Sequence, residues 1–488
     1  MAELHLARAA EASLERLGDY DALWFDGGWL RSGELHSRAA RLAGGLRSCG
    51  VGPGDRVVVL MANCPEVGVA YEAIWRAGAV VTPAIFLLPP AELAHIVADS
   101  GATVILATPE LAENAKEAAG DATVVTTDAF AWLEEADPLP IVPRATEDPA
   151  ALLYTGGTTG RSKGVLLSHE NLWFVGKSAH DAGHLPEIRR GLLALPLSHA
   201  YGLLVTVVGF HAEEPHPSVL MRWFDPTLFL ELMQAHRTQI TAVVPSMLQL
   251  LLAQPLEDYD LSELRYIVSG GSPLPTEVAE KVLQRLPQVE IREGYGLTES
   301  AALVSSTRPG EARLGSVGKA APGVEVRIEG DDEVGEICVR SPGVMLGYWQ
   351  APEQTAEAIR DGWLYTGDLG YVDEDGYLYV VDRKKDLIIR GGFNVFPRDV
   401  EEALLEHPAV AAAGVVGRPD EEHGEEVVAF VELREAIAEE ELVAWSKERI
   451  GGYKYPREVH VLGSLPLTPV GKVDRKALRT RVKELVPK

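Results

Sequence analysis

Short apolar runs alternate with helix-like segments of about a dozen residues, and this alternation restricts the chain to a few architectures. Runs that read as buried strands occupy residues 55–61, 80–85, 103–107, 239–244 and 264–269. Segments with helical periodicity occupy residues 67–78, 90–100, 227–236, 246–253 and 275–286. Strands that alternate with helices in this way predict right-handed βαβ units around parallel sheets. The expected fold class is therefore α/β.

The pattern changes twice toward the C-terminal end, which indicates more than one domain. The 488 residues exceed what one hydrophobic core usually organises. From about residue 313 to 382, short strands with turn signals replace the helical pattern and predict a β-rich subdomain. Beyond the basic run 383–385 the pattern is mixed, with helices expected near 397–406 and 438–450 and strands near 409–417, 426–433 and 457–462.

These changes predict the domain organisation. We expect a large N-terminal domain over residues 1–382, made of parallel-sheet α/β subdomains and the β-rich subdomain. A junction over 383–385 then leads to a small α+β C-terminal domain over 386–488.

The charge balance restricts the partners. Acidic side chains number 72 and basic ones 45, which gives a formal net charge of −27. A chain this negative repels phosphate backbones and anionic lipid, so neither nucleic-acid binding nor binding to a membrane surface is expected. The apolar stretch 192–210 approaches the length of a membrane span but contains Pro196 and His199. It favours a buried strand and helix over stable insertion into a membrane.

Cysteine usage and the N-terminus point to a cytoplasmic protein. The three cysteines, Cys49, Cys64 and Cys338, have no metal-ligand spacing, and such a sparse, odd set is typical of a reducing compartment. The first residues carry acidic groups from Glu3 onward and read as an amphipathic helix instead of a signal peptide.

The most specific local pattern is a glycine-rich loop that follows an apolar strand. Residues 154–164 read Tyr-Thr-Gly-Gly-Thr-Thr-Gly-Arg-Ser-Lys-Gly. Glycines let backbone N–H groups approach a ligand, the threonines add hydroxyl donors, and Lys163 adds a charge that can reach a phosphate. The loop lacks the Gly-Lys-[Ser/Thr] ending of a Walker A motif. The alternative is an ordinary surface turn of small residues.

This loop resembles the phosphate-binding loop of the acyl-adenylate-forming superfamily, which includes acyl-CoA synthetases, luciferases and peptide-synthetase adenylation domains. Gly157 and Ser162 depart from the usual Thr-Ser-Gly-Thr-Thr-Gly-x-Pro-Lys-Gly. Further segments match the family in order: 269–273 (Ser-Gly-Gly-Ser-Pro), 293–299 (Glu-Gly-Tyr-Gly-Leu-Thr-Glu), 365–370 (Tyr-Thr-Gly-Asp-Leu-Gly), 380–386 (Val-Val-Asp-Arg-Lys-Lys-Asp) and 469–476 (Pro-Val-Gly-Lys-Val-Asp-Arg-Lys).

The resemblance implies an ATP site with Mg²⁺. In the family's pattern Tyr295 stacks on adenine, Thr298 hydrogen-bonds the α-phosphate, and Glu299 holds the metal. Asp368 accepts the ribose hydroxyls and Arg383 contacts the ribose. The implied ATP-binding residues are Thr155, Gly156, Gly157, Thr158, Thr159, Gly160, Lys163, Gly271, Ser272, Pro273, Glu293, Gly294, Tyr295, Gly296, Asp368, Val380 and Arg383. For Thr298 and Glu299 the alternative role is helix capping.

The resemblance also implies a mobile C-terminal domain that serves two steps. Lys472 matches the family's catalytic lysine, and Lys385 matches the hinge position at which the small domain pivots. Gly391, Gly392 and Phe393 match the opposite face of that domain, where CoA binds in the second step.

The acyl pocket is expected to be apolar and small. By resemblance it is lined by His199, Tyr201, Val244, Gly271 and Ala301. Such a lining favours an uncharged fatty or aryl tail. His199 is the one group in this set that titrates near neutral pH and is a candidate gate or carboxylate partner; the alternative is a buried structural histidine.

We therefore expect an AMP-forming acyl-CoA synthetase that uses a carboxylic acid, ATP and CoA. A CoA-independent amide synthetase that joins the acid to an amine or amino acid is the main alternative, and a luciferase-like oxygenase is a weaker one. A catalytically silent nucleotide-binding scaffold would be expected to lack Lys163, Glu299 or Lys472, and all three are present.

Overall fold

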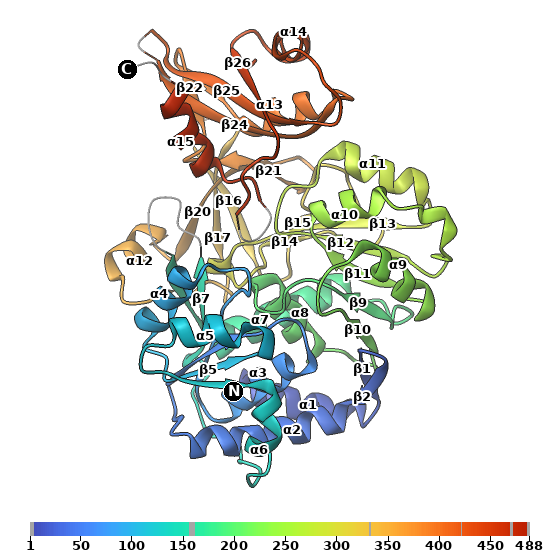
Figure 1. The fold of residues 1–488 in the computed structure, drawn as a ribbon, viewed down its shortest axis with the longest axis vertical. Helices are drawn as coiled ribbons and strands as arrows, with labels where there is room; N and C mark the ends of the chain where they lie inside the picture. The colour runs from blue at the N-terminus through green and yellow to red at the C-terminus, as the bar shows by residue number, and fades with distance from the viewer. Residues whose placement is uncertain (1–3, 156–161, 331–332, 421, 469–471, 486–488) are drawn as a thin grey trace. The chain divides into compact units, whose positions relative to one another are not determined.

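The computed structural model describes residues 4–155, 162–330, 333–420, 422–468 and 472–485. The chain forms two compact units. The first comprises residues 1–326, 338–365 and 374–378, and the second comprises 327–337, 366–373 and 379–488. Figure 1 follows the chain through them by colour. The hinge expected at residues 383–385 concerns the motion of the C-terminal domain, and it stays a prediction.

A seven-stranded sheet lies in the first half of the chain. Its strand order is β18 (Gly347–Tyr348), β8 (Lys163–Ser168), β7 (Pro149–Thr155), β4 (Val80–Pro83), β3 (Arg56–Leu60), β5 (Val104–Ala107) and β6 (Thr123–Thr126). Strands β7 to β6 pair in parallel, whereas β8 and β18 are antiparallel. The helices of this region are α1 (Leu6–Leu17), α2 (Ser32–Ser48), α3 (Pro65–Arg76), α4 (Pro90–Ser100), α5 (Ala112–Ala118) and α6 (Phe130–Leu133).

A nine-stranded sheet follows. Its order is β15 (Lys319–Ala320), β14 (Ser305–Ser306), β13 (Glu290–Tyr295), β12 (Tyr266–Ser269), β11 (Ile240–Val243), β9 (Gly191–Leu193), β10 (Ser218–Leu220), β1 (Asp21–Phe25) and β2 (Gly28–Arg31). The run from β13 to β1 is parallel. Its helices are α7 (His169–Gly183), α8 (Ala200–Gly209), α9 (Pro226–Ala235), α10 (Pro245–Leu252) and α11 (Thr276–Arg285).

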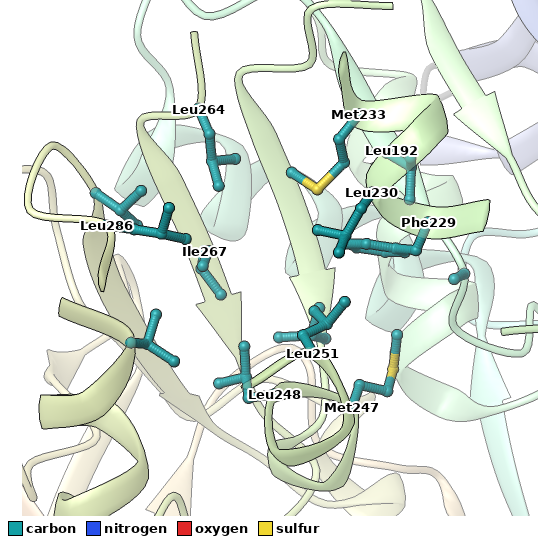
Figure 2. Close-up of a cluster of buried hydrophobic side chains, with 14 of the residues drawn as sticks. Leu192, Phe229, Leu230, Met233, Met247, Leu248, Leu251, Leu264, Ile267 and Leu286 are labelled. Carbon is teal, nitrogen blue, oxygen red and sulfur yellow. The ribbon is translucent and has the colours of Figure 1, made fainter. Parts of the chain in front are cut away.

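The nine-stranded sheet is covered by an apolar core. Figure 2 shows Phe229, Leu230 and Met233 of α9, Leu248 of α10 and Ile267 of β12 in one buried cluster. These side chains are almost fully buried. Burial of each large aliphatic or aromatic side chain contributes about 1.5–3 kcal/mol, so this cluster fixes the helices against the strands.

The apolar stretch 192–210 folds as expected for a buried segment. It forms β9 and α8, with Leu192 and Val207 buried. Among the described residues no helix has both the length and the apolar character needed to cross a membrane.

The β-rich segment is also confirmed. Its sheet runs β16 (Glu325–Glu329), β17 (Gly335–Arg340), β20 (Trp363–Val372) and β19 (Ile359–Arg360), with β21 (Leu378–Arg383) paired to β20. The short helix α12 (Pro352–Ala358) precedes β19.

The C-terminal region has a sheet with a core on each face. The strands are β23 (Phe393–Val395), β22 (Ile388–Arg390), β25 (Gly424–Leu433), β24 (Val410–Asp420) and β26 (Glu458–Leu462). Residues of α13 (Pro397–Leu405) and α14 (Glu439–Arg449) share one core with Val415 and Val427, and residues of α15 (Arg475–Leu485) share the other with Val428 and Phe430.

The expected helices and strands occur within a few residues of their predicted bounds, and the α/β class is confirmed.

One set of long-range hydrogen bonds between the two sheets was not expected. Asn63 follows β3, is 2% exposed, and donates from Nδ2 to the carbonyls of Leu195 (2.8 Å) and Met221 (3.0 Å). Its Oδ1 accepts from Leu197 N at 2.9 Å. Because Leu195 follows β9 and Met221 follows β10, this amide joins the carboxyl ends of the two sheets.

We predict that Asn63→Leu will destabilise the first unit by about 2–4 kcal/mol, because it leaves buried backbone groups without partners. Thermal unfolding should show a melting temperature several degrees lower. Asn63→Asp should also destabilise, because the carboxylate cannot donate to the two carbonyls. An unchanged melting temperature in both variants would contradict the role given to this amide.

Candidate active site

The candidate residues of the first unit follow the carboxyl ends of parallel strands. The glycine-rich loop follows β7, residues 270–273 follow β12, and residues 296–299 follow β13. His199 lies in the connection that leaves β9. Open α/β sheets bind ligands at this edge. The fold therefore gathers segments that are far apart in the sequence.

The base of the glycine-rich loop is a β-hairpin. Thr155 at the end of β7 pairs with Lys163 at the start of β8. Helix α4 holds the returning strand: His95 Nε2 contacts the Ser162 carbonyl at 3.1 Å, and Ser162 N donates to Glu92 Oε1 at 3.3 Å. The predicted residues Gly156, Gly157, Thr158, Thr159 and Gly160 lie outside the described residues.

A tyrosine connects Lys163 with Glu299. Tyr348 Oη donates to Glu299 Oε1 at 2.9 Å, and Lys163 Nζ lies 5.1 Å from the centroid of the Tyr348 ring. Tyr348 reaches this position because β18 pairs with β8, with Tyr348 opposite Val165. Burial, with the Glu299 carboxylate as a further cause, raises the pKa of the Tyr348 phenol, which therefore remains a hydrogen-bond donor.

The segment after β13 has a tight backbone. A Cβ on Gly296 would lie 2.2 Å from the Ala302 carbonyl oxygen, so only glycine fits there. Ala301 and Ala302 both have positive φ, 49° and 70°, which non-glycine residues rarely adopt. Such strain is typical of functional sites. The positive φ of Ala301 ends the short 3₁₀ turn that residues 298–300 form after Tyr295.

Capping is provided by a neighbour of Thr298 and Glu299. Ser300 is buried, and its Oγ accepts from Leu297 N at 3.2 Å. The side chain that caps the backbone N–H of Leu297 is therefore that of Ser300, and neither the Thr298 hydroxyl nor the Glu299 carboxylate does so. Both residues are partly exposed and remain candidates for ligand contacts, as are Glu293, Gly294 and Tyr295 of β13.

The predicted acyl-pocket residues of the first unit lie close together. Tyr201 Oη donates to the Val268 carbonyl at 3.2 Å, which places its ring against Gly270: a Cβ there would lie 3.2 Å from the ring. Gly271 has φ +79°, and a Cβ on it would lie 3.5 Å from Val244 Cγ1. Burial raises the pKa of Tyr201, so the phenol is neutral.

His199 begins the same helix as Tyr201. Its Nδ1 accepts from Tyr201 N at 3.2 Å and caps α8. In this arrangement any proton on the neutral ring is on Nε2.

The other predicted residues of this region differ in exposure. Ala301 is buried, whereas Gly271 and Pro273 are exposed and Ser272 is partly exposed.

In the second unit, Asp368 and Arg383 form an ion pair. Arg383 Nε lies 3.3 Å from Asp368 Oδ1, and the Asp368 side chain is 10% exposed. Val380, three residues before Arg383, contributes its carbonyl to Arg398 Nη1 at 2.7 Å. The predicted ribose-binding pair is therefore assembled on β20 and β21.

Lys472 begins the returning side of a small hairpin. Leu467 and Val473 form an antiparallel bridge, and Thr468 N donates to the Lys472 carbonyl at 2.7 Å. The residue as a whole is exposed, yet protein atoms around its ammonium desolvate it and, with repulsion from Arg383, lower its pKa to about 8. Asp368 opposes this shift.

The predicted hinge residue Lys385 lies in a turn. Asp386 N donates to the Arg383 carbonyl at 2.9 Å, which closes the turn around residues 383–386. Lys385 is exposed overall. Desolvation, followed by repulsion from Arg383, lowers its pKa from the ordinary value.

The predicted CoA-binding residues occupy a different part of the second unit. Gly391 and Gly392 have φ +57° and +82°, and a Cβ on Gly392 would meet no neighbouring atom within 4 Å. Gly391 N donates to the His423 carbonyl at 2.7 Å. Phe393 is 58% exposed, and its ring centroid lies 4.9 Å from that of Tyr453.

Sequence reasoning missed Tyr348, His423 and Tyr453. Each lies near a motif in space, but its own neighbours in the sequence carry no recognisable pattern. Tyr348 is identified by the β8–β18 pairing, which joins positions far apart in the chain.

Comparison with known proteins finds relatives along most of the chain. Residues 10–349 match the family model described as AMP-binding enzyme, and residues 399–472 match the AMP-binding enzyme C-terminal domain. A feruloyl-CoA synthase from Amycolatopsis sp is 40% identical, with 92% of this chain and 93% of the relative covered. A 2-succinylbenzoate–CoA ligase from Geobacillus kaustophilus is 38% identical, with 93% of each covered.

Solved structures show the same similarity. The o-succinylbenzoate CoA synthetase from Bacillus subtilis, in complex with its acyl-adenylate intermediate, superposes with a TM-score of 0.87 at 30% identity, covering 96% of this chain and 97% of that one. The same enzyme in complex with ATP and a magnesium ion gives 0.86 at 30% identity, covering 97% and 99%.

We predict that Gly296→Ala will destabilise the first unit by about 1–3 kcal/mol or more, because the added Cβ forces the Ala302 carbonyl to move. Gly68→Ala is the matched control: it lies in α3, a Cβ there meets nothing within 4 Å, and alanine favours helices. Thermal unfolding should show a lower melting temperature for the first variant and an equal or higher one for the second. Equal melting temperatures would contradict the proposed steric constraint.

Proposed function

The chain belongs to the family of AMP-binding enzymes, and from that membership we propose how its residues divide the work of an AMP-forming acid–thiol ligase. The enzyme activates a carboxylic acid with ATP as an acyl-adenylate, with release of pyrophosphate, and then transfers the acyl group to CoA. The observation that carries the residue assignment is the Lys163–Tyr348–Glu299 cluster at the carboxyl edge of the sheets.

The first step needs positioning and charge neutralisation. A carboxylic acid is already ionised near neutral pH, so no general base is required. The obstacle is to bring one anion in line with a polyphosphate. Lys163 supplies a positive charge at the base of the phosphate loop, and Thr298 supplies a hydroxyl after β13. Fixed groups of this kind stabilise developing charge without reorganising during the reaction.

Glu299 fits a magnesium site with few protein ligands. Tyr348 holds one carboxylate oxygen, and the residue is partly exposed. Among the described residues, three metal-ligand side chains come together at Asp420, His423 and Glu426, a group that does not include Glu299. Mg²⁺ is usually bound by one or two carboxylates together with substrate phosphates, whose charge it neutralises. A single carboxylate is thus sufficient here.

Lys472 is proposed to bridge the acyl carboxylate and the α-phosphate. Its ammonium shares the environment of Asp368 and Arg383, the pair proposed to bind ribose. In the second step a thiol must reach the acyl carbonyl, which Lys472 would obstruct. Rotation of the small domain about Lys385 removes this obstruction and brings Gly391, Gly392 and Phe393 to the site as the CoA-binding face.

The acid is proposed to be an aryl acid, with a fatty acid as the second candidate. The Tyr201 ring lies against Gly270 and is proposed to form an aromatic wall, and the side chains of Val244 and Ala301 add apolar neighbours. Such walls suit a planar apolar tail. The relatives at 40% and 38% identity are named for feruloyl and 2-succinylbenzoate groups, whereas other relatives are long-chain fatty-acid ligases.

A cytoplasmic location is also proposed. ATP and CoA are abundant there, and all three cysteines are free, with Cys64 and Cys338 buried. Unpaired cysteines are typical of a reducing compartment.

The function is tested by measuring pyrophosphate release with ferulate-like, benzoate-like, medium-chain and long-chain acids, and then adding CoA or an amino acid. We expect the highest release with an aryl acid and a product whose mass is that of the CoA thioester. A product mass equal to an amide, with no thioester, would show a CoA-independent amide synthetase instead. No pyrophosphate release with any acid would contradict the proposal.

We predict that Lys472→Ala will lower pyrophosphate release on the order of 10²–10³-fold, because a charge placed at the reacting groups is lost. In the wild type, burial lowers the pKa of Lys472 to about 8, so the required ammonium is present below that pH and is lost above it. The kcat/KM for pyrophosphate release should therefore fall as pH rises through about 8.

The variant Lys472→Arg tests whether the alkaline decline in rate comes from loss of the charge on Lys472. This variant keeps its charge throughout the range, so its alkaline decline should disappear even if its rate is lower. The same alkaline decline in both proteins would show that another group is titrating.

A further inference from the structure

The short segment before the proposed pivot is tied to two elements that follow it. Asp382 is 7% exposed. Its Oδ1 accepts from Arg475 Nη1 at 3.1 Å, and its Oδ2 accepts from the backbone N of Arg398 at 2.9 Å. The Arg398 side chain returns to the same segment and donates from Nη1 to the Val380 carbonyl at 2.7 Å.

A second group of ion pairs lies wholly after the pivot. Arg475 donates to both carboxylate oxygens of Glu401, at 2.8 and 2.9 Å, and approaches Asp386 Oδ2 at 3.3 Å. Arg479 Nη2 donates to Asp386 Oδ1 at 2.5 Å. Glu401 is on α13, and Arg475 and Arg479 are on α15, so these pairs hold α15 against α13 and the end of the turn.

The two groups respond differently to a rotation about Lys385. Residues 386–485 move together, so the pairs among Asp386, Glu401, Arg475 and Arg479 persist. The contacts of Asp382 and Val380 join residues before the pivot to residues after it. A large change in the backbone dihedral angles at Lys385 must break them, because only one of their two sides moves.

In the described arrangement Lys472 lies near the proposed ribose-binding pair. Lys472 follows the pivot, whereas Asp368 and Arg383 precede it, and Arg475, three positions after Lys472, contacts Asp382, the residue before Arg383, at 3.1 Å. Asp368 and Arg383 form the proposed ribose-binding pair. The contacts of Asp382 are therefore present when Lys472 lies beside the nucleotide-binding residues.

We propose that Asp382 and Arg398 form a latch across the pivot that stabilises the adenylate-forming arrangement and is released for the thioester step. Arg475 is the anchor of this latch, since Glu401 and Asp386 keep it in place on the moving side. Asp382 and Arg398 are positioning residues: they act through the location of Lys472 and contact no reacting atom. The inference rests on the proposed function, which supplies the two steps.

The latch controls the balance between two states, so its loss changes the two half-reactions in opposite directions. A group that binds only one state shifts the equilibrium by its full differential contribution. Hydrogen bonds that involve a charged group are among the stronger ones in proteins, and losing one such set corresponds to a shift on the order of tenfold. A residue needed only for folding would lower both half-reactions together.

The test measures the half-reactions separately. Pyrophosphate release is followed in single turnover without CoA, and thioester formation is followed from a chemically synthesised acyl-adenylate mixed with CoA. Asp382→Asn removes the charge with little change of shape. Arg398→Lys is a second variant, which keeps its backbone N–H but shortens the reach to Val380. Arg479→Gln is the matched control, because it removes an ion pair of the same network on one side of the pivot.

We expect the ratio of the adenylation rate to the thioester rate to fall on the order of tenfold in Asp382→Asn and several-fold in Arg398→Lys. It should be unchanged in Arg479→Gln. Melting temperatures identify any loss of folding. An unchanged ratio in the first two variants, or an equal change in Arg479→Gln, would overturn the latch. The proposed function would remain intact in either case, provided that the wild type releases pyrophosphate. Failure of the wild type to release pyrophosphate would overturn both.

Discussion

Carboxylates orient the arginines that lie near the predicted catalytic lysine, and the proposed placement of positive charge depends on this pairing. With a net charge of −27, the chain offers a polyphosphate little general attraction. Arg383 is oriented by Asp368, and Arg475, next to the Lys472 hairpin, is held by Asp382, Asp386 and Glu401. Lys163 instead lies over the Tyr348 ring. Local contacts thus set where each positive charge is placed, against the field of the whole chain.

The general plan could be predicted from the sequence because it depends on local patterns. Apolar runs such as residues 55–61 and 264–269 became β3 and β12, and the loops after β7, β12 and β13 carried the motifs. In a parallel sheet all carboxyl ends lie along one edge, so the loops after β12 and β13 had to lie on the same edge once the strands were identified. The loop after β7 belongs to the other sheet, whose carboxyl end is linked to theirs by Asn63. Sequence patterns therefore predicted the class of fold, which is confirmed, and the ends of the strands at which the candidate site residues lie.

The supporting contacts could not be predicted, because they join residues without local signals. Tyr348 reaches Glu299 through a two-residue strand, β18, that pairs with β8. Asn63 meets Leu195 and Met221 only after two separate sheets have folded. A buried amide or phenol looks the same in sequence as an exposed one. Its role is decided by its partners, and those are set by tertiary packing.

The spacing of Lys472 and Arg475 explains how one short segment can belong to both the chemistry and the hinge. Two residues separate Lys472, which is proposed to leave the site for the thioester step, from Arg475, which is bound to Glu401 of α13. Arg475 begins α15, and Leu478 and Val482 of this helix pack against β24 and β25 of the C-terminal sheet. The segment that carries Lys472 is therefore attached to the body of the small domain. In the proposed rotation the lysine therefore moves with the whole domain, and the contact of Asp382 with Arg475 opposes this movement.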